Sequence, residues 1–523
     1  MVAPRALTRR DAILILMGAS IMGTSIMHLF TIFFPHETAP PEIPIDTVRE
    51  HFPTDPLPPP PEVTRYHTKP TAVVQATTTT ATAVTLPSVS LASLSALDLA
   101  LEFPPTAIVA HAPGWTLFQN LFMSNGTFFI VTDTQSDFPE IRLMASNPLA
   151  ATNTQNRVLS VDGNTVLVNE PSQFLLQYYH FVAELIFGVQ AFWHGAFSTP
   201  SDDVDRDYIL GPHPAPPPID RVIFARSNGD RWRDRLGFNA YFMRAAFPAT
   251  TIEVDEDWAD RVTLTTAGDR AWHFPLLLLT DRSASHRGLV CGSQTQRIAA
   301  EAFVAMRAKN QLVGVRVGGW WEPVRSAVLR FAGVDLRPTD NSEQVVLDSD
   351  TAEGDPRLPM PAKIVITYIS RQSAGQRKLM RESHEGLVRE LKDLVKRKGD
   401  KWEFLEVELE KISKDEQLKI AARTTILLGV HGNGLTHLIM MQPTRFSTVI
   451  EIFFPQGFSH DYQWTTNALG MKHFAVWNDT YRTEGLGDGK PNVAYPVGFQ
   501  GNEIPVHAPT IAKLIEDRVE GRV

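Results

Sequence analysis

The most regular pattern of apolar and polar positions lies after Pro361, in the C-terminal third of the chain. Apolar, β-branched runs typical of buried parallel strands alternate there with segments whose apolar residues recur every three or four positions, as in helices. The pattern predicts strands at 363–369, 402–407, 425–430, 448–454 and 473–477, and helices at 376–398, 414–423, from 433 and around 459–469. Strands alternating with helices predict an α/β fold with a doubly wound, Rossmann-like sheet.

Between positions 114 and 350 the pattern is less regular, although it also predicts α/β organisation. Strand-like runs lie at 126–132, 221–226, 261–265 and 274–279, and helical patterns lie around 174–194 and 296–307. The connections between these predicted elements are irregular, so the sequence does not determine the order of the strands in the sheet. An acidic loop rich in turn residues follows at 338–361, and it marks a boundary between an N-terminal domain, 114–350, and a C-terminal domain, 351–523.

The N-terminus carries the longest apolar stretch. Residues 12–34 contain no Lys, Arg, Asp or Glu, and as a helix they would span roughly 35 Å, enough to cross a bilayer. Arg5, Arg9 and Arg10 precede the stretch, so the positive-inside rule predicts a cytosolic tail at 1–11 and a lumenal body. The alternative is a cleaved signal peptide, but its apolar region is shorter and ends at a small-x-small cleavage site.

Residues 35–113 are rich in Pro and Thr, with few apolar residues to bury. Such sequence stays extended and disordered, as in a linker or an O-glycosylated stalk. Sequons at Asn125 and Asn478 are candidates for N-glycosylation and fit a lumenal body. A tail, a signal anchor, a stalk and a large body together predict a single-pass type II membrane protein of the Golgi or endoplasmic reticulum.

The composition of the chain and the absence of certain motifs exclude several classes of protein and site. The formal net charge of −9 argues against a nucleic-acid binder, and a lone cysteine, Cys291, can form neither an intramolecular disulfide nor a Cys-based zinc site. The chain lacks the G-x-S-x-G elbow of α/β-hydrolases, the Walker A motif of P-loop NTPases and the HExxH motif of zinc peptidases.

In a doubly wound sheet, ligands bind at the loops that follow the carboxyl ends of the strands. One such loop holds Arg371 and Arg377, whose guanidinium groups suit a pyrophosphate, although a solvated basic loop would have the same residues. Another begins a helix, where free N–H groups can hold a phosphate, although a plain tight turn would look similar. The residues of that second loop are His431, Gly432, Asn433 and Gly434.

Glu451 is a carboxylate in a strand that is otherwise apolar. Burial of an unpaired carboxylate is costly. Glu451 therefore either points to a rim, where it binds hydroxyls such as those of a ribose, or forms a structural ion pair. The sequence leaves both alternatives open.

Four segments of the chain are similar to one known family: ILLGVHGNGLTH, STVIEIFFPQGFSHDYQW, YISRQSAGQRKLMRESHE before them, and QYYHFVAELIFG at 177–188. In these segments the chain resembles glycosyltransferase family 61. The resemblance implies a GT-B fold of two Rossmann-like domains, with a UDP-sugar bound mainly by the C-terminal one. It also implies inversion at the anomeric carbon and no required metal or other cofactor. Donor contacts implied by the resemblance are Arg371, Arg377, His431, Gly432, Asn433, Gly434 and Glu451. The family usually has a small residue where this chain has Asn433, which implies an additional side chain in the phosphate loop.

An inverting transferase also needs a base for the proton of the acceptor hydroxyl. His180 and Glu184 lie four positions apart in a predicted helix, so they share one face and can form a base and its orienting partner. A structural role for His180 between the domains is the alternative. The expected reaction transfers GlcNAc or a xylose-like sugar from a UDP-sugar to a Ser/Thr hydroxyl of a protein or to a glycan hydroxyl.

Two other functions remain open. A metal-dependent GT-A transferase would use an Asp-x-Asp pair, and four candidates occur, at Asp203/Asp205, Asp205/Asp207, Asp255/Asp257 and Asp348/Asp350. A non-catalytic lumenal lectin or scaffold would keep a transferase fold without its activity. The retained arginines and the glycine-containing loop argue against such decay.

Overall fold

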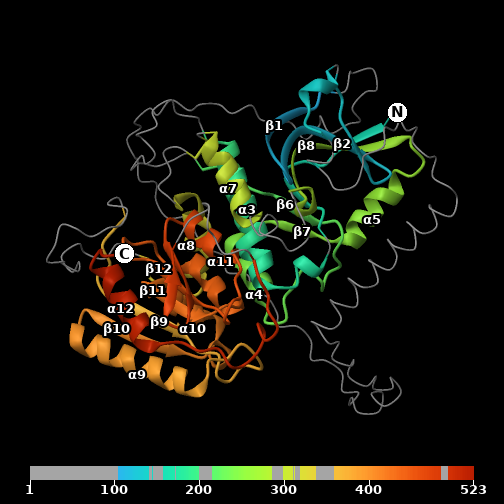
Figure 1. Ribbon diagram of the computed structural model, residues 1–523. Coiled ribbons are helices and arrows are strands. Elements are labelled where there is room, and N and C mark those ends of the chain that lie inside the picture. Colours follow the sequence, from blue (N-terminus) through green and yellow to red (C-terminus); the bar gives the residue numbers. More distant parts are fainter. Residues whose placement is uncertain are drawn as a thin grey trace, which may run out of the picture. The chain divides into compact units, whose positions relative to one another are not determined.

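The computed structural model describes residues 104–132, 134–140, 144, 157–170, 172–198, 215–285, 298–309, 311–312, 318–336, 358–483 and 493–523. The predicted tail, the anchor at 12–34 and nearly all of the stalk lie outside the described residues. Within those residues, no helix is both long and apolar enough to cross a bilayer. The described residues belong to one unit of the chain, Val89–Val523, and contain a mixed α/β fold with two sheets (Figure 1).

The N-terminal sheet has a parallel core extended by antiparallel strands. Its order is β1-β2-β8-β5-β6-β7, with β3 beside β2 and β4 beside β8. Strands β8, β5, β6 and β7 are mutually parallel, whereas β2 runs antiparallel to β8. The strands are β1 (Ala107–Ala112), β2 (Trp115–Ser124), β3 (Thr127–Phe129), β4 (Arg157–Ser160), β5 (Asn164–Val168), β6 (Arg221–Phe224), β7 (Thr251–Glu253) and β8 (Arg270–Thr280). The parallel core is the half-Rossmann arrangement, in which the strand order reverses between the neighbouring parallel strands β5 and β8.

The helices that follow these strands cover both faces of the N-terminal sheet. A π-helix, η5 (Tyr179–Ile186), continues into α3 (Phe187–Ala196) after β5. These two and α4 pack on one face of the sheet, and Trp258 of α5 packs on the other. The remaining N-terminal helices are α4 (Phe238–Ala246), α5 (Asp255–Leu264), α6 (Arg282–Ser285), α7 (Ile298–Ala308) and α8 (Glu322–Phe331), with short 3-10 turns η3 (Gln135–Asp137), η4 (Ser172–Phe174) and η8 (Gly319–Trp321).

The C-terminal sheet has the order β10-β9-β11-β12-β13-β14 and is parallel up to β13. Strands β9, β11 and β12 are buried along their whole length, which explains their continuous apolar sequences. The elements are β9 (Ile364–Ile369), α9 (Arg381–Lys398), β10 (Trp402–Val407), η10 (Leu409–Lys411), α10 (Lys414–Arg423), β11 (Ile426–Val430), η11 (Asn433–Met440), β12 (Thr448–Ile452), α11 (Asp461–Ala468), β13 (Lys472–Trp477), β14 (Thr480–Arg482) and α12 (Ala508–Val519). In this sheet the strand order reverses between the neighbouring strands β9 and β11.

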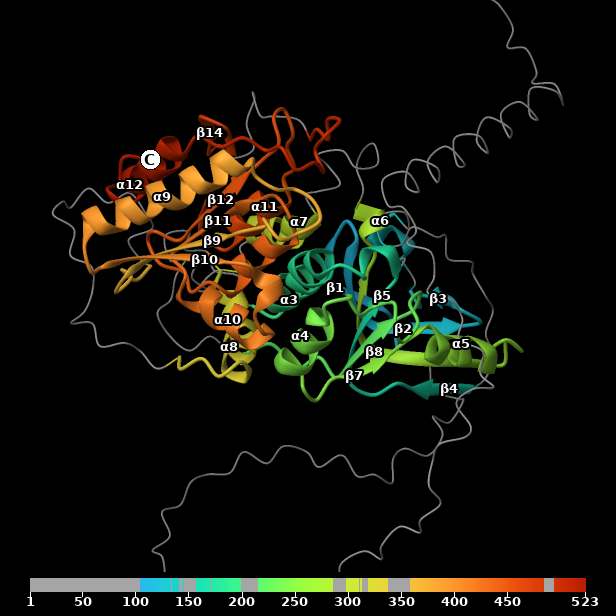
Figure 2. The same cartoon turned by 90° about the horizontal axis from the view of Figure 1, so that it is seen from below.

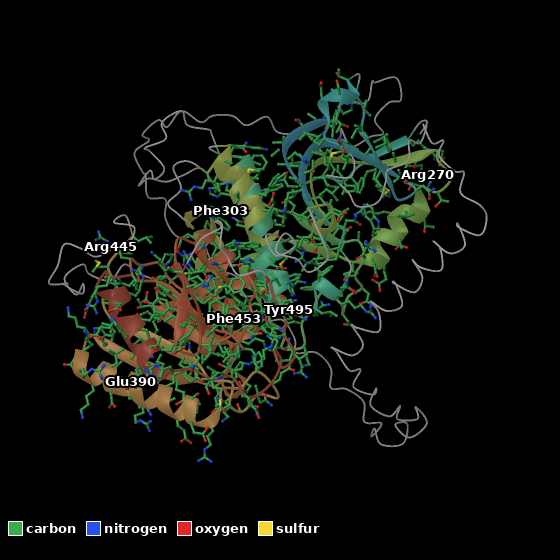
Figure 3. All side chains as sticks on the ribbon, in the orientation of Figure 1. Arg270, Phe303, Glu390, Arg445, Phe453 and Tyr495 are labelled. Atoms are coloured by element: carbon green, nitrogen blue, oxygen red, sulfur yellow. The ribbon has the colours of Figure 1, made fainter. Side chains whose placement is uncertain are left out.

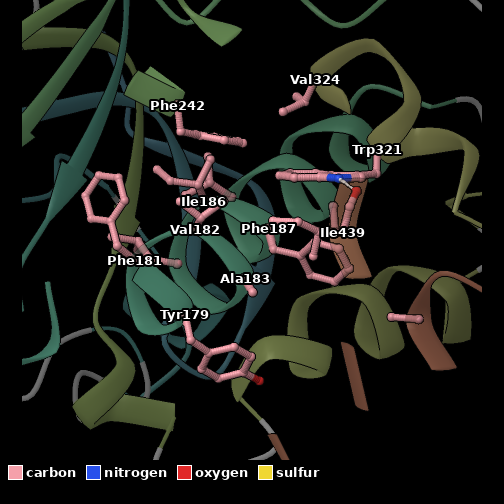
Figure 4. Packing of buried hydrophobic residues seen from close by; sticks show 14 of the residues in the cluster. Tyr179, Phe181, Val182, Ala183, Ile186, Phe187, Phe242, Trp321, Val324 and Ile439 are labelled. Atoms are coloured by element: carbon pink, nitrogen blue, oxygen red, sulfur yellow. Dashed lines mark hydrogen bonds between the residues drawn. The ribbon is translucent and has the colours of Figure 1, made fainter. Parts of the chain in front are cut away.

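The two faces of the C-terminal sheet have different partners. Apolar side chains of α9 and α12 pack on one face, and Figure 2 shows the two helices on the same side of the sheet. Those of α10, η11 and α11 pack on the other and join one apolar core with α3, α4 and α8 of the N-terminal half. In this shared core the rings of Phe242 and Trp321 stack with centroids 5.9 Å apart, and Trp321 Nε1 donates to the Ile439 carbonyl at 2.9 Å (Figure 4).

The structure corrects two expectations from the sequence. Residues 261–265, predicted as a strand, end α5 instead. The β-branched sequence there is misleading, because the hydroxyl of Thr265 donates to carbonyls of the preceding turn, as in a helix. The stalk was predicted to reach position 113, yet Ala107–Ala112 form β1, because their backbone pairs with β2. The strands and helices predicted after position 361 are confirmed apart from shifts at their ends, and η11 is a 3-10 helix.

Candidate functional site

The C-terminal part of the site lies where β9 and β11 end. These neighbouring parallel strands flank the point at which the strand order reverses, the usual ligand site of such sheets. The loop after β9 carries Arg371 and Arg377, and the loop after β11 carries His431 and Gly432. The fold therefore brings together the two loops that the sequence singled out.

Both arginines lie against the backbone of Gly432. A Cβ atom added to Gly432 would lie 3.1 Å from Arg371 Nη1 and 3.3 Å from Arg377 Nη1, so a larger residue would require both guanidinium groups to shift by a few tenths of an ångström. Arg377 Nη1 also donates to the His431 carbonyl at 3.2 Å. Arg371 is held by a bond from Nη2 to the Gln376 carbonyl, at 3.2 Å. Gly432 thus leaves room for two cations at the start of η11.

The charge of this pair is concentrated and poorly compensated. Among the described residues neither Arg371 nor Arg377 forms an ion pair, and Arg371 Nε is buried without a hydrogen-bond partner. Burial lowers the pKa of both guanidinium groups, and the charge of Arg371 lowers the pKa of Arg377 further. Two partly desolvated cations beside the first residues of η11 have the chemistry to bind an anion with several oxygens, such as a diphosphate.

Glu451 lies beneath this site between two histidines. Its Oε1 lies 2.5 Å from His431 Nδ1, its Oε2 lies 2.7 Å from His473 Nε2, and its side chain is 0% exposed. Burial raises the pKa of Glu451, whereas burial and the neighbouring Arg377 and Arg371 lower the pKa of His431. Glu451 is therefore not at a rim where it would bind hydroxyls. The structure supports the alternative of a buried polar pairing, which orients the His431 ring.

The His431 ring is also held by aromatic neighbours. It stacks on Phe453 with ring centroids 5.4 Å apart, and Phe453 is labelled in Figure 3. Tyr462 of α11 meets the same imidazole edge-on, with centroids 5.6 Å apart. The side chain of His431 is only 10% exposed. These contacts therefore hold the His431 ring in place below the two arginines.

The N-terminal part of the site lies on η5, directly after β5. His180 Nδ1 lies 2.7 Å from Glu184 Oε2, which confirms that the two side chains share one face. The His180 side chain is 32% exposed and that of Glu184 is 7% exposed. Burial opposes the charged form of His180, but Glu184 outweighs it and raises the pKa of the imidazole. The pair has the geometry of a base and its orienting carboxylate.

Sequence reasoning missed the residues that hold this pair. Arg282, just after β8, donates from Nη1 to Glu184 Oε2 at 2.7 Å and to the His180 carbonyl at 3.0 Å. Its guanidinium also pairs with the buried Glu170, just after β5. Since β5 and β8 flank the reversal in the N-terminal sheet, the network occupies the equivalent position to the arginine site. The only available signal was that these residues follow strand ends.

The two parts meet at Tyr179. Its backbone N–H donates to Asn433 Oδ1 at 3.0 Å, and its hydroxyl lies 3.2 Å from Thr465 Oγ1 of α11. Asp461, the first residue of α11, lies close to both parts, and burial and Glu184 raise its pKa to about 6. His180 and the arginine site therefore belong to one site, although about 190 to 250 positions separate them along the chain.

The residues of the Asp-x-Asp alternative have another role where they are described. Asp255 and Asp257 lie in the first turn of α5, and Asp257 Oδ2 accepts the Val254 N–H at 2.9 Å, a helix-capping bond. The other candidate pairs lie outside the described residues. In the described ranges, no group of three His, Cys, Asp or Glu side chains has the arrangement of a metal site.

Both sequon asparagines are exposed at turns. Asn125 lies between β2 and β3, and Asn478 lies between β13 and β14. Each has a positive φ, 50° and 52°, as is common for Asn in a tight turn. Their accessibility is compatible with N-glycosylation, which stays a prediction.

Comparisons with known proteins agree with this site. The family model of Glycosyltransferase 61 matches residues 172–450, more than half of the chain, and the match contains His180, Arg282, Arg371 and Gly432. A stretch of 98 residues is 36% identical to the EGF domain-specific O-linked N-acetylglucosamine transferase of Drosophila melanogaster. That stretch is 19% of this chain and 17% of the relative. The extent of the family match shows that this chain belongs to glycosyltransferase family 61.

Proposed function

We propose that this protein transfers a sugar from a UDP-sugar to a hydroxyl of a glycoprotein or glycan, with inversion at the anomeric carbon. One observation carries the proposal. Two partly buried guanidinium groups, those of Arg371 and Arg377, lie against Gly432 without a carboxylate partner among the described residues, in the same site as the His180–Glu184 pair. The cations suit a diphosphate leaving group, and the pair suits removal of a proton from an acceptor.

In the proposed reaction, the acceptor oxygen forms a bond to the anomeric carbon while the bond from that carbon to the diphosphate oxygen breaks. The acceptor proton moves to His180, and the UDP leaves with the bonding electrons. Glu184 stabilises the imidazolium that forms, because its carboxylate lies 2.7 Å from His180 Nδ1. Arg371 and Arg377 balance the charge on the departing diphosphate, so the reaction requires no metal ion or other cofactor.

The donor sugar and the acceptor are proposed at the level of class. GlcNAc is one candidate, because the relative described above is named an O-linked N-acetylglucosamine transferase; a xylose-like sugar is the other. That name also makes a polypeptide with an EGF domain an acceptor to test. We further propose a GT-B arrangement, with the donor held by the C-terminal half, and a type II anchor that places this body in the lumen of the Golgi or endoplasmic reticulum.

The proposal is tested by assaying the full-length protein with UDP-GlcNAc and UDP-xylose against a folded EGF domain and a set of glycans. UDP release and the mass of the acceptor are measured. His180→Ala is expected to bind UDP normally and to lose transfer by about 100-fold or more, as for removal of a general base. Glu184 keeps its bond to Arg282 in this variant, so the fold is retained.

The control is His507→Ala, which removes an exposed histidine at the start of α12. It is expected to transfer at the wild-type rate. Undiminished transfer by His180→Ala would exclude His180 as the base. UDP binding without transfer to any acceptor would instead favour a non-catalytic lectin or scaffold.

A further inference from the structure

The side chain of Asn433 joins the two parts of the site. Asn433 is the first residue of η11 and directly follows Gly432 in the loop below the arginines. Its Oδ1 accepts the N–H of Tyr179, the first residue of η5, at 3.0 Å. The next residue along η5 is His180. A single hydrogen bond therefore connects the proposed donor loop to the helix turn that carries the proposed base.

The need for this bond follows from helix geometry. The first N–H groups of a helix have no acceptor inside the helix, so a side chain or water must satisfy them. The residue before η5, Tyr178, provides no capping hydrogen bond from its side chain. Asn433 supplies the acceptor from a position 254 residues away, in the other half of the molecule. It thus acts as an N-cap provided from a distance.

The orientation of the Asn433 amide is also determined. A backbone N–H can only donate, so the atom that faces Tyr179 must be the amide oxygen. The Thr436 hydroxyl donates to the same Oδ1 at 3.3 Å, which holds the amide in place. Asn433 is otherwise exposed, and among the described residues its amide nitrogen donates no bond. That nitrogen remains available to a ligand in the loop.

The other contacts of this turn do not replace the bond from Asn433. Glu184 and Arg282 act on the ring and the carbonyl of His180 from within the N-terminal half. The Tyr179 ring packs on Tyr462 of α11, with centroids 4.6 Å apart, and so fixes a side chain. Among the described residues, only Asn433 joins the backbone of η5 to the loop that holds Gly432.

We propose that Asn433 is a positioning residue: it caps the helix turn that carries His180 and sets the place of this base relative to the donor loop. The inference deepens the proposed function and rests on it for the role of His180. The bond itself is independent of that function. Loss of the cap frees the first turn of η5, and a misplacement of about 1 Å at a reacting group can cost about 100-fold in rate.

The test uses the full-length protein and two substitutions at one position. Asn433→Ala removes the acceptor, whereas Asn433→Asp keeps an oxygen there and adds a charge near the arginines. Three quantities are measured: hydrogen exchange of the Tyr179 amide, the Kd of UDP, and kcat for transfer. Asn467→Ala is the matched control, because Asn467 is exposed on α11 and lies outside this contact.

Asn433→Ala is expected to speed exchange of the Tyr179 amide about tenfold, as for loss of a helix cap. Its kcat should fall about 10- to 100-fold, while the Kd of UDP changes less than about threefold. Asn433→Asp should keep the protection of the amide but weaken UDP binding, since a carboxylate repels the diphosphate. The control should match the wild-type protein in all three measurements.

Unchanged protection of the Tyr179 amide in Asn433→Ala would overturn the cap. Lost protection with an unchanged kcat would overturn the positioning role, as would a fall in UDP affinity large enough to account for the lost activity. Failure of the wild-type protein to transfer any sugar would overturn the proposed function and the positioning role with it. The exchange measurement would then still decide whether Asn433 holds η5.

Discussion

At the residue scale, Gly432 decides how closely two cations can approach one loop. Its backbone has a φ of +156°, a conformation that residues other than glycine rarely adopt, and an added Cβ would be in tight contact with the guanidinium groups of Arg371 and Arg377, 3.1 and 3.3 Å away. The same two groups are desolvated, and no carboxylate of the described residues pairs with them. Glycine is thus required here by a close approach as well as by the turn.

Gly432→Ala is therefore expected to displace the guanidinium groups and to weaken UDP binding about tenfold, the equivalent of one hydrogen bond to a charged group. Calorimetric titration with UDP measures the change. Gly375→Ala is the matched control in the same loop region, because an added Cβ there would meet nothing within 4 Å. Equal affinity of the Gly432→Ala variant and the wild-type protein would show that UDP does not bind over this glycine.

At the element scale, the parallel sheet after position 361 could be predicted from the sequence because its strands are buried on both faces and its helices are amphipathic. Both features leave a local pattern, and Ile364–Ile369 shows it most clearly. The strands of the N-terminal half are harder to predict from the sequence. Strands such as Ala107–Ala112 form because distant strands pair with them, not because of a local sequence pattern. The end of helix α5, at 261–265, is predicted as a strand for a different reason: its β-branched residues resemble a strand pattern, whereas Thr265 bonds to carbonyls of the preceding helical turn.

The candidate site could be predicted in part by the same logic. Arg371, Arg377 and Gly432 follow strand ends in a regular sheet, so their convergence was foreseeable. The partners of His180 could not be predicted from the sequence, because Arg282 lies about a hundred positions away in a half whose strand order the sequence does not determine. Nor does the sequence show that Asn433 bonds to Tyr179, since a side-chain cap normally comes from the same helix.

Packing between elements also predicts a pH dependence of stability. His437 of η11 is buried against α10, with its Nε2 2.9 Å from Gln417 Oε1. Burial lowers the pKa of His437 to about 4, whereas in the unfolded chain it is about 6.5. Between these values the unfolded chain binds a proton that the folded protein does not, so stability falls as the pH falls, by roughly 1.4 kcal/mol per unit.

His437→Gln should remove this contribution. Between pH 7 and pH 5 the free energy of unfolding of the variant should fall about 2 kcal/mol less than that of the wild-type protein, as measured by urea denaturation. Asp461, whose pKa burial raises to about 6, acts in the opposite direction but does so equally in both proteins. The exposed His507→Gln is the control for loss of a histidine. An identical pH dependence in all three proteins would contradict the assignment.

At the scale of the whole molecule, the two halves share one apolar core and one site. The core runs from α3 and α8 into α10 and η11, and the site uses strand ends of both sheets. The proposed base, His180, comes from one half and the proposed diphosphate site from the other, an arrangement that would suit a reaction between two substrates. This division agrees with membership of glycosyltransferase family 61, whose model covers residues of both halves.

The most direct test of this account is a calorimetric titration of the full-length protein with UDP in the presence of EDTA. We expect the wild-type protein to bind without a metal, Arg371→Ala to bind about 10- to 100-fold more weakly, and the control Arg381→Ala to bind like the wild-type protein. Arg381 is an exposed residue of α9 that pairs with Glu385. Binding that requires Mn²⁺, or that is equally tight in Arg371→Ala, would contradict the proposal that the arginines over Gly432 hold the diphosphate.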